Sequence, residues 1–102
     1  MSSSWRYIFL ALFSAVSFAW ASAPSLELRR KIAEAAGSAA LDPLLVEAVM
    51  EVESKFKHAI SPKGAIGLMQ VMPRTADANG IHNPHHAFDN LMGACEYLRK
   101  LI

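Results

Sequence analysis

The clearest helical pattern in this chain lies between Asp42 and Ser54. Asp42 is a good N-cap residue, Pro43 suits the first helical position, and the residues that follow favour helix. At about 100° per residue, one stripe of apolar side chains should face the core. Its members are Leu45, Val49, Val52 and Phe56. The pattern predicts a helix that packs through this stripe.

Four further segments are predicted to be helical, and no segment alternates apolar and polar residues over a useful strand length. These helices are expected at Ser25–Ala36, Leu68–Met72, Arg74–Asn79 and Phe88–Leu101. Gly37, Pro73 and Gly80 supply the stop signals. The predicted fold class is therefore mainly α. A chain of 102 residues has room for one small domain.

An apolar run near the N-terminus follows a single basic residue. Arg6 precedes the run Ile8–Phe18, and small residues come after it, which is the layout of a secretory signal peptide. The run is short for a membrane span, which needs about 20 residues. We expect residues 1–21 to be a signal peptide cleaved after Ala21, and residues 22–102 to form the domain. An uncleaved leader that tethers the chain to a membrane is the alternative.

Charge and cysteine content narrow the class of partner. Without Arg6, 9 basic residues remain against 9 acidic ones, and this balance argues against nucleic acid as a partner. Cys95 is the single cysteine, so no internal disulfide is possible and the leader has no cysteine for a lipid anchor. We expect Cys95 to be a buried structural residue. The expected product is exported to the periplasm or medium without a lipid anchor.

Glu53 is the candidate for acid chemistry. It lies about 60° from the centre of the apolar stripe, so it should be half-buried near the end of its helix. Burial disfavours the ionised carboxylate and raises its pKa, which lets a glutamate keep a proton at neutral pH and donate it. The alternative is a surface ion pair between Glu53 and Lys57, four residues further on.

The segment after this helix has the composition of a tight turn followed by an apolar stretch. Pro62 fixes φ, and Gly64 permits positive φ. Gly67 allows a close backbone approach that would leave room for a bulky ligand. Gln70 carries both a donor and an acceptor, which suits a sugar hydroxyl or an N-acetyl group. The segment therefore predicts a carbohydrate-binding surface next to Glu53.

Several segments, in order and spacing, closely resemble the lytic transglycosylase domain of the soluble type, which is related to goose-type lysozyme. They read E-S-x-F from Glu53, S-P-x-G-A-x-G-L-M-Q-V-M-P-x-T-A from Ser61, L-D-P-L-L from Leu41, N-P from Asn83, and N-L-M-G-A-C-E-Y-L from Asn90. The resemblance covers nearly everything after the leader. It implies a lysozyme-like fold.

The resemblance also implies a reaction. In this family one glutamate, here Glu53, protonates the oxygen that links N-acetylmuramic acid to N-acetylglucosamine in peptidoglycan. It then acts as base on the muramoyl C6 hydroxyl, which closes a 1,6-anhydro ring. Ser61 and Gln70 would orient the substrate, and Met72 would line the groove, while Met69 would lie in the core. No cofactor is implied. Such an enzyme can open the wall for a secretion or conjugation apparatus.

The sequence departs from the family pattern at its C-terminal end. Members usually continue past the last helix into a segment with an Ala-Tyr-Asn-Ala-Gly-like motif, and this sequence ends at Ile102 without it. We therefore expect the C-terminal part of the domain to be missing. The alternative function is a non-catalytic or vestigial peptidoglycan-binding protein.

Other polar residues are weaker candidates. Asp77 and Asp89 have no comparable apolar setting, so no second catalytic carboxylate is expected. His82, His85 and His86 match no zinc-binding spacing. We expect them to be surface loop residues, and we expect no metal site.

Overall fold

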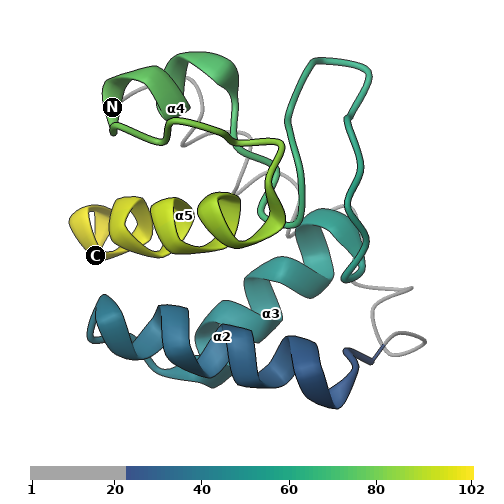
Figure 1. The fold of residues 1–102 in the computed structure, drawn as a ribbon, viewed down its shortest axis with the longest axis vertical. Coiled ribbons are helices and arrows are strands. Elements are labelled where there is room, and N and C mark those ends of the chain that lie inside the picture. Colours follow the sequence, from purple (N-terminus) through teal and green to yellow (C-terminus); the bar gives the residue numbers. More distant parts are fainter. Residues whose placement is uncertain (1–22) are drawn as a thin grey trace.

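The computed structural model describes residues 23–102 and is mainly helical in that part (Figure 1). The helices are α2 (Leu26–Ser38), α3 (Pro43–Ser54), α4 (Pro73–Ala78) and α5 (Ala87–Leu101). The predicted signal peptide, residues 1–21, lies outside the described residues. Within the described part, no helix has both the length and the apolar character that crossing a membrane requires. The prediction of a mainly α fold is confirmed.

Helices α2, α3 and α5 enclose the core. Helix α2 packs against both α3 and α5, and Figure 1 shows α5 lying along α2 while α3 runs toward a long loop. The most deeply buried side chains are Ile32, Ala35, Ala36, Val46, Met50, Leu91 and Cys95. The two alanines of α2 allow its neighbours to approach closely. Cys95 is buried, as expected.

The helix ends agree closely with the predicted ones. Ser25 is the N-cap of α2, where its hydroxyl oxygen accepts a hydrogen bond from the Leu28 amide. The helix runs through Gly37 and ends two residues later than predicted, at Ser38. Helices α4 and α5 each begin one residue earlier than predicted.

The buried face of α3 differs from the predicted stripe. Val46, Val49 and Met50 are buried, whereas Leu45 is 39% exposed, and Val52 and Phe56 are half-buried. The reason is that α3 packs its side toward α2, which turns Leu44 and Leu45 outward. Residues 46, 49, 50 and 53 share one face of a helix. Glu53 therefore lies in line with the core residues.

The predicted helix at Leu68–Met72 is wrong. The chain instead makes a turn at residues 67–70, closed by an antiparallel bridge between Ile66 and Val71. A second bridge joins Ile60 to Ile66, so three short passes of the chain lie side by side. Every residue from 65 to 71 is buried, and a short run that is apolar on all sides does not distinguish a helix from a buried extended segment.

Candidate active site

Helix α3 places Glu53 in its last turn. The Asp42 carboxylate accepts a hydrogen bond from the Leu44 amide at 2.8 Å, which caps the start of the helix. At the other end, Lys55 and Phe56 both adopt the left-handed conformation, with φ of 53° and 64°. Two consecutive non-glycine residues in this region are unusual. They turn the chain sharply away immediately after Glu53.

The carboxyl group of Glu53 is held in an apolar setting. Its side chain is half-buried, and this burial raises its pKa from 4.5 to about 8. Its Oε2 atom is buried and has no hydrogen-bond partner among the described residues. At neutral pH the group is therefore mostly protonated and able to donate.

The alternative expectation of an ion pair between Glu53 and Lys57 is wrong for the described part of the chain. The ion pairs found there join Arg29 to Glu47 and His86 to Asp89. Lys57 is exposed, and the raised pKa of Glu53 has desolvation as its cause. A neighbouring ammonium group would lower that pKa.

Ser61 closes the turn at the tip of the loop. Its hydroxyl oxygen accepts a hydrogen bond from the Ala65 amide at 2.9 Å, and its own amide donates to the Ala65 carbonyl at 2.9 Å. Pro62 and Gly64 lie within this turn, and Gly64 has φ of 91° as expected. Ser61 is half-buried. The Ser61 hydroxyl therefore stabilises the turn as a hydrogen-bond acceptor.

Gln70 has a structural role in the turn. It adopts the left-handed conformation with φ of 52°, and only 9% of the residue is exposed. Its Nε2 donates to the carbonyls of Ala59 at 3.0 Å and Gly67 at 2.9 Å. The predicted donor for a substrate is therefore already used by the backbone. The hydrogen bond to Ala59 ties the turn to the residues that follow α3, and the one to Gly67 closes the turn itself.

The two methionines beside Gln70 differ in their surroundings. Met69 is 2% exposed and belongs to the core, in agreement with the expectation. Met72 is half-buried and is the N-cap residue of α4, without a side-chain capping bond.

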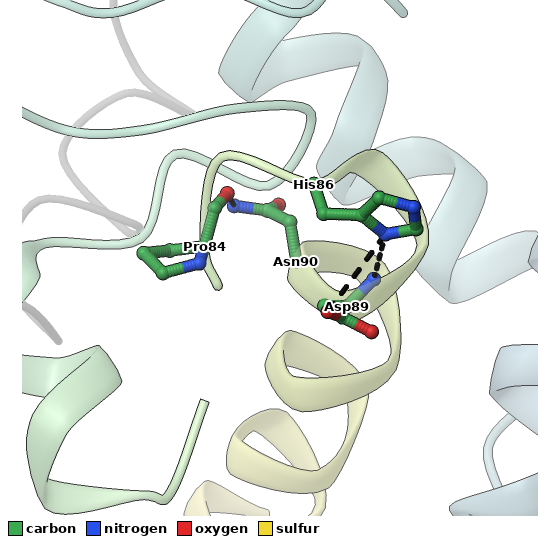
Figure 2. Close-up of polar contacts among 4 residues, drawn as sticks. All are labelled: Pro84, His86, Asp89 and Asn90. Carbon is green, nitrogen blue, oxygen red and sulfur yellow. Dashed lines mark hydrogen bonds and ion pairs between the residues drawn. The ribbon is translucent and has the colours of Figure 1, made fainter. Parts of the chain in front are cut away.

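Asn90 is a site-building residue that the sequence reasoning missed. It is fully buried on α5, its Nδ2 donates to the carbonyls of Ile66 at 2.8 Å and Pro84 at 2.9 Å, and its Oδ1 accepts from the Met69 amide at 2.9 Å. Figure 2 shows the amide of Asn90 directed toward Pro84. One side chain thus joins α5, the loop before it and the turn beside the site.

Gly67 lies in close contact with Asn90. A Cβ atom on Gly67 would lie 2.6 Å from the Asn90 Nδ2 atom, and the glycine has φ of 78°. The expected close approach therefore exists, but its partner is Asn90. A signal was present in the sequence, because Asn90 shares a helix face with Ala94 and Leu98, and a polar residue on an apolar face is informative.

The remaining polar candidates lie away from an apolar setting. Asp77 and Asp89 are exposed, as are His82, His85 and His86. His86 caps α5, where its Nδ1 accepts from the Asp89 amide at 3.4 Å and lies 3.8 Å from an Asp89 carboxylate oxygen (Figure 2). Among the described residues, no cluster of three or more His, Cys, Asp or Glu side chains is placed to hold a metal ion.

Comparison with known proteins agrees with this arrangement. The Transglycosylase SLT domain family matches residues 30–102. A transglycosylase of Enterobacteria phage PRD1 is 41% identical over 61 residues, which are 59% of this chain and 23% of the phage protein. Membrane-bound lytic murein transglycosylase C is 52% identical in Actinobacillus pleuropneumoniae serotype 5b and 50% identical in Haemophilus ducreyi. Each of these two matches spans 52 residues, 50% of this chain and 13% of the relative.

These matches define the class of the protein. The chain belongs to the Transglycosylase SLT domain family, whose lysozyme-like, helical fold agrees with the structure. The chain spans less than a quarter of the length of these relatives. No solved structure matches it significantly.

Proposed function

We propose that this chain is a peptidoglycan lytic transglycosylase that cleaves the β-1,4 bond between N-acetylmuramic acid and N-acetylglucosamine, with Glu53 as its single acid and base. The observation that carries the proposal is the half-buried Glu53 carboxyl, whose pKa is raised to about 8 and whose Oε2 has no partner among the described residues. Membership of the family and the names of the relatives support the same reaction.

Glu53 takes part in two proton transfers, first as an acid and then as a base. Protonated Glu53 gives its proton to the glycosidic oxygen as the bond from the muramoyl C1 to that oxygen breaks. The resulting carboxylate then takes the proton of the muramoyl C6 hydroxyl while O6 bonds to C1. The 1,6-anhydro ring closes without water, and Glu53 is protonated again. Because the nucleophile belongs to the substrate, its effective concentration is high and no second carboxylate is needed.

The loop residues contribute unequally to this proposal. The Gln70 amide nitrogen holds the turn, so a sugar contact from Gln70 falls to its carbonyl oxygen. The Ser61 hydroxyl accepts from Ala65 and would donate its own hydrogen to the substrate. Met72, half-buried at the start of α4, would line the groove.

We also propose export of the chain to the cell envelope, where peptidoglycan lies. Residues 1–21 would act as a signal peptide cleaved after Ala21, and the mature protein would lie in the periplasm or the medium. Intact-mass analysis of the secreted product tests the cleavage site. Association with a secretion or conjugation apparatus is a further proposal, tested by co-purification from envelopes that contain such an apparatus.

The test of the reaction is mass spectrometry of the soluble products released from purified peptidoglycan. The wild type should release anhydro-muropeptides, and Glu53→Gln should release at least about 10²-fold less, because a positioned general acid contributes about 10²–10⁴-fold. Glu51→Gln, the same change on a neighbouring residue of α3, is the matched control and should remain active.

Two other outcomes would contradict the proposal. Products with reducing ends would indicate hydrolysis by water. Binding of both the wild type and Glu53→Gln to the polymer, with no product from either, would support the alternative function of a non-catalytic peptidoglycan-binding protein.

A further inference from the structure

Although the net charge is nearly balanced, the basic and acidic residues are unevenly distributed along the chain. Between Ser54 and Ala76 there are four lysine or arginine residues and no aspartate or glutamate. The four are Lys55, Lys57, Lys63 and Arg74. All nine acidic residues lie elsewhere, alongside five basic ones in the part that follows the leader. The segment therefore carries a charge of +4 and the remainder of residues 23–102 carries −4. We refer to residues 55–74 as the basic loop.

The basic loop begins beside the candidate acid. All four of its basic side chains are exposed, and Lys55 follows Glu53 by two residues. Figure 1 shows the loop rising from the end of α3 and returning to α4. The first positive charge of the loop therefore lies two residues after the candidate catalytic glutamate.

The bridges of the loop arrange these charges along its length. Ile60 and Val71 both pair with Ile66 in the antiparallel sense, so the segments that follow Ile60 and Val71 leave the bridges in the same direction. This places Lys63 and Arg74 toward one end of the loop. Lys57 precedes the first bridge and lies toward the other end, near α3. A ligand held by all three would lie along the loop.

Part of the opposite charge lies elsewhere on the molecule. A cleft between the α4–α5 connection and α5 is lined by Asp89 and Glu96 among others. An anionic polymer would be repelled there and attracted to the basic loop. The separation of charge therefore favours one orientation on such a polymer.

We propose that the basic loop docks the carboxylates of the peptide stems of peptidoglycan and so places the neighbouring glycan strand at Glu53. The proposal rests on the function proposed above. The amino sugars of the strand carry no free charge when acetylated and peptide-linked, so the stem carboxylates are the anions that this polymer offers. Protonated Glu53 adds no opposing charge. Because the side chains are exposed, their attraction acts through several charges together and weakens with salt.

Co-sedimentation with purified peptidoglycan tests the docking. The full chain is used with Glu53→Gln throughout, so that the polymer stays intact. The test variant adds Lys57→Gln, Lys63→Gln and Arg74→Gln, and the matched control adds Arg30→Gln, Lys31→Gln and Lys100→Gln, which remove the same charge from exposed positions elsewhere. Each protein is also mixed with peptidoglycan whose carboxyl groups have been amidated.

The expected result is loss of affinity by about tenfold or more in the test variant, with the control within about twofold of its parent. Amidated polymer should weaken the parent by a similar factor, as should high salt. Equal binding by the test variant and the control, or equal binding of the parent to native and amidated polymer, would overturn the proposal. Equal or stronger binding of the parent to anionic lipid vesicles or to DNA at the same salt would overturn the choice of partner.

The design separates this proposal from the proposed reaction. Binding is measured in proteins that lack Glu53, so its result does not depend on cleavage. A second assay restores Glu53 and uses glycan strands whose stem peptides have been removed and whose freed lactyl carboxyl groups have been amidated, so that the strands carry no charge. Cleavage of these strands at the wild-type rate by the triple variant, together with slower cleavage of whole peptidoglycan, is the expected pattern. Loss of both rates would assign the three residues to folding or catalysis and overturn the docking role.

Discussion

The three longer helices and the loop that follows Glu53 are stabilised in different ways. In α2, α3 and α5 the buried side chains are mostly apolar, lie at helical spacing and pack on one another. The loop also buries Leu68, Met69 and Val71 in the core, but it depends in addition on polar contacts between residues distant in sequence, which come from Asn90 and Gln70. Glu53 lies where the two regions meet.

Backbone strain follows the same division. Among the described residues, four that are not glycine have positive φ, and three of them are Lys55, Phe56 and Gln70 at the two ends of the loop. Such conformations persist only where surrounding contacts impose them. The comparison teaches that the apolar spacing along the helices positions Glu53. The buried side-chain amides of Asn90 and Gln70 position the loop beside it.

The largest expected effect comes from removing the side chain that joins the two regions. Asn90→Ala removes three hydrogen bonds and leaves buried backbone groups of Ile66, Met69 and Pro84 without this partner. We expect a loss of about 4 kcal/mol in the free energy of unfolding, because each such group costs about 1–3 kcal/mol. Urea unfolding measures it.

The matched control is Asn79→Ala, which removes a hydrogen bond to the Thr75 carbonyl on the short helix α4. It should cost about 1 kcal/mol. Similar losses in the free energy of unfolding of the two variants would show that the Asn90 hydrogen bonds do not stabilise the loop.

The next effect tests the packing of the apolar face of α3. Met50→Ala removes a fully buried side chain of α3 and should cost about 3 kcal/mol. Leu44→Ala, on the same helix but 73% exposed, should change the free energy of unfolding by less than about 0.5 kcal/mol. The reverse order would mean that α3 does not pack through the face that carries Met50.

A smaller effect tests the contact between the turn and α5. Gly67→Ala places a Cβ atom 2.6 Å from the Asn90 Nδ2 atom at a positive φ, whereas Gly64 has positive φ and open space around it. We expect a loss of about 2 kcal/mol for Gly67→Ala and about 1 kcal/mol for Gly64→Ala. Thermal unfolding of the two variants measures both losses, and their difference is the cost of the clash with Asn90. Equal losses in the free energy of unfolding would refute the close contact between Gly67 and Asn90.

A further effect, which depends on pH, concerns Glu53 itself. Below pH 4.5 the carboxyl is protonated in both the folded and the unfolded chain. Between 4.5 and about 8 the folded chain keeps a proton that the unfolded chain releases, so the free energy of unfolding falls as pH rises through this window. Glu53→Gln lacks this dependence, and its melting temperature should rise relative to the wild type from pH 5 to pH 8.

Glu51→Gln is the control for that series and should follow the wild type across the same range. A constant difference in melting temperature between Glu53→Gln and the wild type at all pH values would show that Glu53 titrates alike in both states.

The helices were predictable because each has a local signal. Asp42 and Pro43 mark the start of α3, and apolar spacing marks α5. The half-burial of Glu53 was also predictable, from its place on a helix face. These signals act within a few residues, and a single sequence contains them in full.

The turn at residues 67–70 was not predictable in the same way. Leu68 and Met69 favour helix locally, but the partners that bend the chain are Asn90, more than twenty residues away, and the Ala59 carbonyl. The hydrogen bonds of Gln70 were not predictable for the same reason, since its donor appears free until the position of Ala59 is known. Hydrogen bonds between residues distant in sequence therefore determine the conformation of this turn.

The most direct test of the account is an NMR titration of the Glu53 carboxyl in the wild type, with the resonance assigned by its loss in Glu53→Gln. The account predicts a midpoint near pH 8, as burial in an apolar setting without a counter-charge requires. A midpoint near 4.5, the ordinary value for glutamate, would mean that Glu53 is ionised at neutral pH and would contradict its role as the general acid.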